Sequence, residues 1–296
     1  MKTETITINS ETCQKCALCA EVCPNKIIKF DEQNNFYFRD DRINLCFKCG
    51  QCMSICPSKS IIIQDLSYSN NFFELPKEIA NESEFLNLLA TRRAVRNFKD
   101  KPVPKELLEK IVQAIKLAPP SFPPIKTELV VVQNRELIKS ALPYMIEFYD
   151  FVLSSMKNPI ARFFIKQSAG KEKFNVIKNH LVPLMKSRLP ELKLGTEDTL
   201  TRNASAMILF HANKNAENYQ TDIYIAASYG MLALHSLGLG GSIMDIIPPP
   251  INKKDELKKM FLIPETNEVV TSLIIGYPKY KYQRGIKREL KSIKWL

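Results

Sequence analysis

Two stretches of the sequence share one cysteine pattern and decide the fold of the first part of the chain. The first reads Cys13-x2-Cys16-x2-Cys19-x3-Cys23-Pro24, and the second reads Cys46-x2-Cys49-x2-Cys52-x3-Cys56-Pro57. The second stretch repeats the first at an offset of 33 residues, and together they hold all 8 cysteines of the 296-residue chain. The sequence therefore divides into a small cysteine-rich part and a long part without cysteine.

The spacing within each stretch suits a cubane cluster of iron and sulfur. Three thiolates at positions i, i+3 and i+6 of a tight loop can bind three corners of one cluster, while a fourth cysteine, followed by proline, leaves the loop and reaches the other cluster. This crossover predicts two 4Fe-4S clusters. The ligands of the first are Cys13, Cys16, Cys19 and Cys56, and those of the second are Cys46, Cys49, Cys52 and Cys23.

Zinc binding is the competing interpretation of these cysteines. Zinc modules usually pair two cysteines and then leave a long gap, so a third cysteine three residues on and the Cys-Pro pairs have no role in them. Residues 1–11 lack the apolar core of a signal peptide, and no uninterrupted apolar run of about 18 residues exists. We therefore expect a cytoplasmic protein without a membrane segment, in which disulfides would be rare.

Over residues 6–64 the sequence resembles the bacterial two-cluster ferredoxins, on the cysteine and proline positions just quoted. The resemblance implies a ferredoxin domain over residues 1–66. Apolar segments predict short strands at 27–30, 35–38, 43–45 and 61–63, which would shield the clusters from water. The polar residues after this domain predict a linker over 67–80, so a second domain would span residues 81–296.

The second domain contains a group of arginines just after a predicted helix. Apolar spacing predicts helices over 81–91, 105–117 and 222–237, and apolar runs predict strands over 128–133 and 269–275. The first helix leads into Arg92-Arg93-Ala94-Val95-Arg96-Asn97-Phe98. Arginine binds phosphate well because its planar guanidinium offers several donors and keeps its charge. The segment is a candidate phosphate site, although clustered arginines also occur on solvated surfaces.

In this order the elements are similar to the FMN-dependent nitroreductase family, from about Phe85 to the C-terminus. Three motifs carry the similarity: the arginine segment 92–98, a Leu-Gly-Leu-Gly turn at 237–240, and Gly276-Tyr277-Pro278 with basic residues beyond it. The resemblance implies an α+β fold with a sheet flanked by helices, an obligate homodimer, and FMN at the dimer interface. It implies that FMN is bound by Arg92, Arg93, Ala94, Arg96, Ser121, Gly241, Ser242, Arg284, Lys287 and Arg288.

The combination predicts an iron–sulfur flavoprotein oxidoreductase. Clusters pass single electrons, whereas FMN accepts one or two, so FMN can collect electrons in pairs for a small organic acceptor such as a nitroaromatic, quinone or enone. The electron donor would be a ferredoxin-like protein or NAD(P)H. We expect no dedicated catalytic side chain, and we expect His235 to be a buried, hydrogen-bonded residue. The alternative is a redox carrier or sensor that exchanges electrons with a protein partner without turning over a small substrate.

The net charge of +11 is not spread evenly along the chain. Residues 151–190 alone carry eight basic residues against one acidic residue. A positive charge concentrated in one segment, without a recognisable nucleic-acid-binding motif, gives no reason to expect a nucleic-acid partner. Apolar residues interleave with the basic ones at helical spacing, and three interpretations stay open: an amphipathic helical pair covering the active site, a basic lid for an anionic substrate or acidic donor, and a membrane-surface helix.

Overall fold

The structure, a computed structural model, describes residues 6–77 and 80–296. These residues fall into two compact units. The first unit holds the described residues from Ile6 to Ala80 together with residues 122–125, and the second holds residues 81–121 and 126–296. Each unit has hydrophobic core residues of its own.

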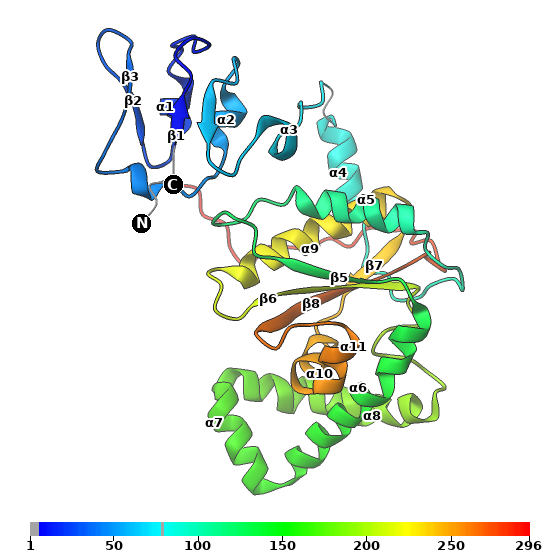
Figure 1. The fold of residues 1–296 in the computed structure, drawn as a ribbon. Coiled ribbons are helices and arrows are strands. Elements are labelled where there is room, and N and C mark those ends of the chain that lie inside the picture. The colour runs from blue at the N-terminus through cyan, green and yellow to red at the C-terminus, as the bar shows by residue number, and fades with distance from the viewer. Residues whose placement is uncertain (1–5, 78–79) are drawn as a thin grey trace. The chain divides into compact units, whose positions relative to one another are not determined.

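The first unit is built from short strands and short helices (Figure 1). β1 (Ile6–Ile8) pairs antiparallel with β4 (Ile61–Ile63), and β2 (Ile28–Phe30) pairs antiparallel with β3 (Phe36–Phe38). Alternate residues of β1 and β4 point inward, so that their isoleucines pack with the buried Met53 in one core. The strands expected around residues 27–30, 35–38 and 61–63 are therefore present.

The two cysteine repeats also repeat in local structure. α1 (Leu18–Val22) and α2 (Gln51–Ile55) each begin after a residue with left-handed backbone, Ala17 (φ 61°) and Gly50 (φ 75°). Each helix ends at a cysteine that precedes proline, Cys23 or Cys56, and both cysteines have extended backbone. The proline ring disfavours the helical conformation of the residue before it, which explains why both helices stop there.

Two segments of the first unit differ from the sequence-based predictions. Residues 43–45, predicted as a strand, form a 3-10 helix, η1 (Ile43–Leu45). The amides of Leu45 and Cys46 donate to the carbonyl groups three residues back, at 2.9 and 3.3 Å, so the backbone bonds are local rather than to a neighbouring strand. The predicted linker 67–80 contains a short helix, α3 (Tyr68–Asn71), which Ser67 caps by accepting from the amide of Asn70. The domain boundaries stay predictions.

The second unit is organised around a four-stranded antiparallel sheet in the order β5-β6-β8-β7. Its strands are β5 (Glu128–Val132), β6 (Ala206–Asn213), β7 (Gly240–Ile243) and β8 (Asn267–Gly276). The position of β7 corrects one prediction, because Gly240, expected to be the last residue of a turn at 237–240, begins this edge strand. Gly241 and Ser242 follow in the same strand and pair with Ile275 and Ile274 of β8.

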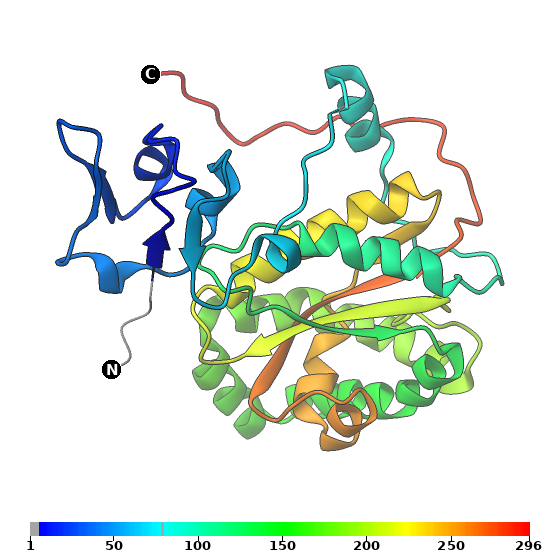
Figure 2. The same ribbon diagram turned by 45° about the horizontal axis from the view of Figure 1, so that its top comes forward.

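Helices cover both faces of this sheet (Figures 1 and 2). On β6, Ile208 and Phe210 pack with one set of helices, whereas Met207 and Leu209 point to the other face. The first set is α5 (Lys105–Lys116) and α9 (Tyr219–Ser236), and the second is α6 (Arg135–Lys157), α8 (Val182–Leu194), α10 (Pro248–Lys253) and α11 (Asp255–Met260). The predicted α+β fold, with a sheet flanked by helices, is confirmed.

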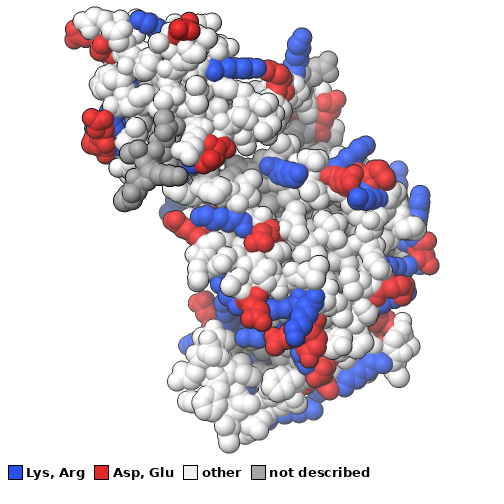
Figure 3. Space-filling view, in the orientation of Figure 1, with Lys and Arg blue, Asp and Glu red and all other residues white. Residues whose placement is uncertain are grey.

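The basic segment 151–190 is almost entirely helical. It comprises the end of α6, α7 (Pro159–Val176), a π-helical turn η2 (Ile177–Leu181) and the start of α8. Gly170 interrupts α7 with non-helical backbone (φ 77°, ψ 161°). Phe163 and Phe164 are exposed, and Figure 3 shows a largely uncharged surface over the end of the unit where α7 lies. No helix of the described residues is long and apolar enough to cross a membrane.

Candidate metal centres and cofactor site

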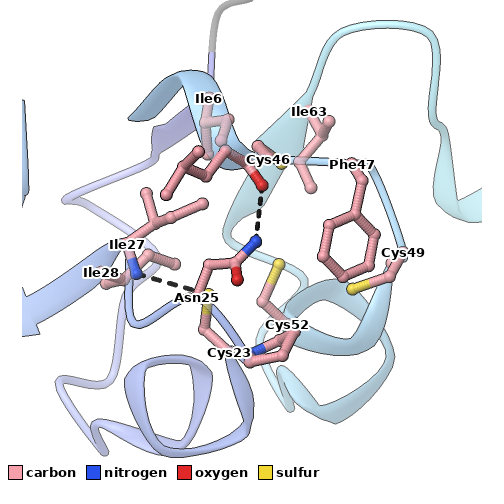
Figure 4. Close-up of a pocket in the computed structure, with 13 residues that line it drawn as sticks. Ile6, Cys23, Asn25, Ile27, Ile28, Cys46, Phe47, Cys49, Cys52 and Ile63 are labelled. Carbon is pink, nitrogen blue, oxygen red and sulfur yellow. Dashed lines mark hydrogen bonds between the residues drawn. The ribbon is translucent and has the colours of Figure 1, made fainter. Parts of the chain in front are cut away.

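The first unit gathers its cysteines into two sets of four, each around its own cavity. One cavity is lined by Cys23, Cys46, Cys49 and Cys52 (Figure 4), and the other by Cys13, Cys16, Cys19 and Cys56. In each set three cysteines come from one repeat and the fourth comes from the other. The structure thus brings together the same four cysteines that the spacing assigns to each cluster. That they bind iron stays a prediction.

Apolar side chains surround the cavity of the second repeat. Ile6, Ile27, Ile28 and Ile63 line it together with the ring of Phe47 (Figure 4). The side-chain amide of Asn25 donates to the carbonyl oxygen of Leu45 at 2.6 Å. This bond joins the turn after Cys23 to the residue before Cys46, so it fixes the two repeats relative to each other at the cavity.

Burial and mutual repulsion act on the thiols of both sets. Burial, together with repulsion from the other three cysteines of the same set, raises the pKa of Cys19 to about 11 and that of Cys52 to about 12. Thiolates at such positions require a nearby positive charge, which a bound metal centre supplies. No group of three or more His, Cys, Asp or Glu residues in the described ranges is arranged to hold a single metal ion. Four soft sulfur donors around each cavity fit a 4Fe-4S cluster.

Backbone amides point at several of the sulfur atoms. The amides of Lys15 and Ile27 approach Cys13 Sγ and Cys23 Sγ at 3.4 Å, and the amide of Ser60 approaches Cys56 Sγ at 3.3 Å. Lysines occupy the left-handed positions of these turns: Lys15, Lys26, Lys48 and Lys59 have φ between 50° and 53°. The repeated lysines therefore mark turns that bring amide donors to the cysteines, and such donors tune a cluster's potential.

The arginine segment lies along the edge of the sheet in the second unit. α4 (Glu82–Thr91) begins with a capping box between Asn81 and Glu84 and ends before Arg92. Beyond Arg92 the amide of Val95 donates to the carbonyl oxygen of Gly241 at 2.9 Å, and the amide of Lys99 donates to that of Tyr277 at 2.8 Å. These bonds hold the segment between β7 and the chain that follows β8.

Glycines make this close approach possible. A Cβ on Gly240 would lie 2.8 Å from the side chain of Val95, and one on Gly241 would lie 2.5 Å from the carbonyl oxygen of Ile274. A Cβ on Gly276 would lie 2.7 Å from the ring of Phe98. Gly240 and Gly276 are therefore required where the arginine segment packs against the sheet, and Gly241 is required where β7 lies against β8.

Arginines from distant parts of the chain meet beside α4. Arg93 Nη1 donates to the carbonyl oxygen of Ala90 at 2.7 Å, and Arg93 Nη2 donates to that of Arg284 at 3.3 Å. Arg93 Nε is buried and has no hydrogen-bond partner among the described residues. Burial lowers the pKa of Arg92, and the neighbouring Arg288 and Arg93 lower it further.

The arginine group of Arg92, Arg93 and Arg288 has no acidic ion-pair partner among the residues that the structure describes. Within residues 6–77 and 80–296, the ion pairs made by arginine involve Arg39, Arg42, Arg135, Arg188 and Arg202, and none involves Arg92, Arg93 or Arg288. Repelling guanidinium groups with an unused N–H donor favour the binding of an anion with several acceptor oxygens. The residues therefore fit the phosphate of FMN.

The other predicted FMN residues lie in different places. Arg96 is exposed, and it acts electrostatically on Arg202 rather than on Arg92. The amide of Ser121 donates to Asp222 Oδ1 at 2.8 Å, and the buried hydroxyl of Ser242 donates to the carbonyl oxygen of Ile243 at 3.0 Å. Ala94 forms a bridge with Gly241, and Lys287 is exposed. The structure thus brings only part of the predicted set together.

Sequence reasoning assigned no binding role to two residues beside the arginines. His235 is half-buried, and its Nε2 lies 2.9 Å from Thr91 Oγ1, directly before Arg92. The expected hydrogen bond is present, but the ring is half-buried rather than buried. The partner, Thr91, was not foreseen because it lies on another helix. Arg202 was also missed, and its Nε is buried without a hydrogen-bond partner in the part of the chain that the structure describes.

Two family models match the chain. One is described as the nitroreductase family and matches residues 89–277, and the other is described as a 4Fe-4S dicluster domain and matches residues 12–61. The first covers more than half of the 296 residues.

Curated relatives and solved structures match mainly the second unit. A protein of Methanothermobacter thermautotrophicus, provisionally named NADH dehydrogenase/NAD(P)H nitroreductase, is 21% identical over 202 residues, which is 67% of this chain and 79% of the relative. A protein of the same name from Archaeoglobus fulgidus is 24% identical over 66% of this chain and 86% of the relative. A nitroreductase with bound FMN from Desulfitobacterium hafniense DCB-2 has a TM-score of 0.55 and 19% identity, covering 74% of this chain and 100% of that chain.

Proposed function

This chain belongs to the nitroreductase family and carries a 4Fe-4S dicluster domain ahead of the family region, and from that premise we propose that it is an iron–sulfur flavoprotein that passes electrons between two 4Fe-4S clusters and FMN and reduces a small organic acceptor. One observation carries the proposal. Two four-cysteine cavities occur in the same chain as an arginine group that has no acidic ion-pair partner among the described residues.

In this proposal each cavity of the first unit holds one cluster. Cys13, Cys16, Cys19 and Cys56 bind the first cluster, and Cys46, Cys49, Cys52 and Cys23 bind the second. The amides that approach Cys13, Cys23 and Cys56 stabilise negative charge on those sulfurs. The surrounding isoleucines exclude water from the second cavity.

The second unit is proposed to bind FMN through the arginine group. Arg92, Arg93 and Arg288 hold the phosphate, and the fixed backbone from Val95 to Lys99 keeps the first two in place. The FMN-bound nitroreductase from D. hafniense supports this assignment at the level of the fold. When bound, the clusters supply one-electron transfer, and FMN connects it to a two-electron reduction. The further proposed FMN contacts are Ala94, Arg96, Ser121, Gly241, Ser242, Arg284 and Lys287.

We also propose that the chain forms a homodimer with FMN at the interface. Large apolar side chains of α4 and α9 are exposed, including Phe85, Leu86 and Tyr224, and a second copy would cover them. The names of the two archaeal relatives favour NAD(P)H as the electron donor. A ferredoxin-like protein is the other donor to be tested.

Anaerobic turnover tests the proposed function. The full chain is mixed with NADH, NADPH or a reduced ferredoxin and with nitroaromatic, quinone and enone acceptors, and loss of each acceptor is followed. We expect turnover of at least one acceptor, which stops when FMN is removed and returns when FMN is added. A chain that neither retains nor rebinds FMN would refute the proposal.

A paired variant separates the two cofactors. Cys16→Ala with Cys49→Ala removes one predicted ligand from each cluster and none from the FMN site, so FMN binding should persist while ferredoxin-driven turnover is lost. Reduced protein that no small acceptor reoxidises, but that a protein partner does, would instead favour the redox-carrier alternative.

A further inference from the structure

His235 lies in the last turn of α9 and contacts the residue that precedes the arginine pair. Its Nε2 is 2.9 Å from Thr91 Oγ1. Thr91 has a single hydroxyl proton, and that hydroxyl already donates to the carbonyl oxygen of Asn87, 2.7 Å away within α4. The contact with His235 is therefore an Nε2–H that donates to the threonine oxygen. Nδ1 is left as the ring nitrogen that can take up a proton.

Burial and the charges around the ring disfavour its charged form in the absence of an anion. Burial lowers the pKa of His235, and Arg92 and Arg93 lower it further; no other charged group of the described residues acts on the ring. The charge of Arg288 repels that of Arg92, and the carbonyl oxygen of Arg284 accepts from Arg93. The C-terminal residues 284–288 therefore reach the same two arginines. A histidine at the C-terminal end of a helix would otherwise favour the cation. Burial and the arginines act against that preference.

We propose that His235 is a proton-coupled member of the phosphate site, and that its Nδ1 takes up a proton from solvent when the FMN phosphate binds beside Arg92 and Arg93. This inference rests on the proposed FMN site. A phosphate dianion neutralises the two arginines and removes their repulsion on the imidazole, so the bound state favours the imidazolium. Thr91 holds the ring in place through its bond to Nε2.

The proposal fixes the sign of the pH dependence. The neutral ring adds no charge to the site, so FMN should bind more weakly as the pH rises past the pKa that His235 has in the complex. The phosphate itself loses charge below about pH 6, because its second pKa lies near that value. The effect of His235 is therefore measured between about pH 6.5 and 8.5, where the phosphate stays dianionic.

Calorimetric titration measures the proton directly. FMN is titrated into the full, cluster-loaded chain after removal of flavin, at about pH 7 in buffers of different ionisation heat. We expect net proton uptake with FMN and none with riboflavin, which lacks the phosphate. His235→Gln keeps an amide that can donate to Thr91 but cannot titrate, so it should abolish the uptake and weaken FMN binding about five- to tenfold.

Two controls keep the outcome clear. His180→Gln is the same change at an exposed residue of η2 and should behave like the wild type. Riboflavin binding should be unchanged in His235→Gln, which shows that this variant is folded. Equal proton uptake by the wild type and His235→Gln, or uptake with riboflavin, would overturn the proposal. A wild-type chain that binds no FMN would refute the FMN site itself, whereas FMN binding without uptake that depends on His235 would refute only the present inference.

Discussion

Replacing Gly240 with alanine tests how the arginine segment is held. The added Cβ would lie 2.8 Å from Cβ, Cγ1 and Cγ2 of Val95, whereas carbon atoms in contact are separated by about 3.5–4.0 Å. Val95 cannot rotate away, because its own Cβ is among the clashing atoms and its amide is bonded to Gly241 at 2.9 Å. The segment would have to move away from β7.

The expected cost follows from these contacts. Inserting a carbon into a packed site costs about 1–3 kcal/mol, and losing the hydrogen bond of Val95 costs about 0.5–1.5 kcal/mol. Gly240→Ala should therefore lower the free energy of unfolding of the second unit by roughly 1.5–4.5 kcal/mol. For a unit of this size the melting temperature should fall by about 3–18 °C.

Thermal melts of the FMN-free chain, followed by FMN titration, measure both consequences. FMN binding should weaken because Arg92 and Arg93 move with the segment. Gly230→Ala is the matched control, because its Cβ would come no nearer than 3.1 Å to any atom, at Ile115 Cδ1 and Cγ1, and alanine favours the interior of α9 by about 1 kcal/mol. That control should melt within about 3 °C of the wild type. If Gly240→Ala melts and binds FMN like the wild type, the close approach does not hold the segment.

Three further predictions concern the cysteines, Arg288 and the buried His211. Cys23→Ala and Cys56→Ala should each lower the iron content from about eight to about four per chain, and an iron assay that finds no loss in either variant would contradict the crossover. Arg288→Ala should leave the FMN-free chain at least as stable, since it removes repulsion on Arg92, yet weaken FMN binding about tenfold or more; an unchanged Kd would contradict this. Burial lowers the pKa of His211, so below about pH 6.5 the unfolded chain binds the proton first and stability falls toward acid. Melting curves between about pH 7 and 5 should show a smaller fall in His211→Asn.

The parts of the fold that sequence reasoning predicted are those with local causes. Cysteine spacing sets which thiols can converge, and apolar spacing marks the helices that pack on the sheet. The segment 43–45 was wrongly predicted to be a strand, because an apolar-polar-apolar triplet suits both a strand and a 3-10 helix. Gly240 was expected in a turn because glycine usually marks one. Its real cause is tertiary, because Val95 of the arginine segment approaches β7 too closely for a Cβ at this position.

The candidate site depends on contacts that sequence spacing does not contain. Arg92 and Arg288 come together across most of the second unit, and only the family resemblance suggested their association. The same resemblance grouped Arg96 with them, whereas the structure sets it beside Arg202. The bond between Thr91 and His235 joins the ends of α4 and α9. No periodicity within either helix predicts that these ends meet.

The cofactor content of one anaerobic preparation of the full chain tests the central claim most directly. Iron, acid-labile sulfide, zinc and FMN are measured on the same sample, together with the absorption spectrum before and after reduction. Two occupied cysteine cavities and one FMN site predict about eight iron atoms, about eight sulfides and about one FMN per chain, with no bound zinc. Zinc in place of iron, or a chain that holds its clusters but neither contains nor rebinds FMN, would contradict it.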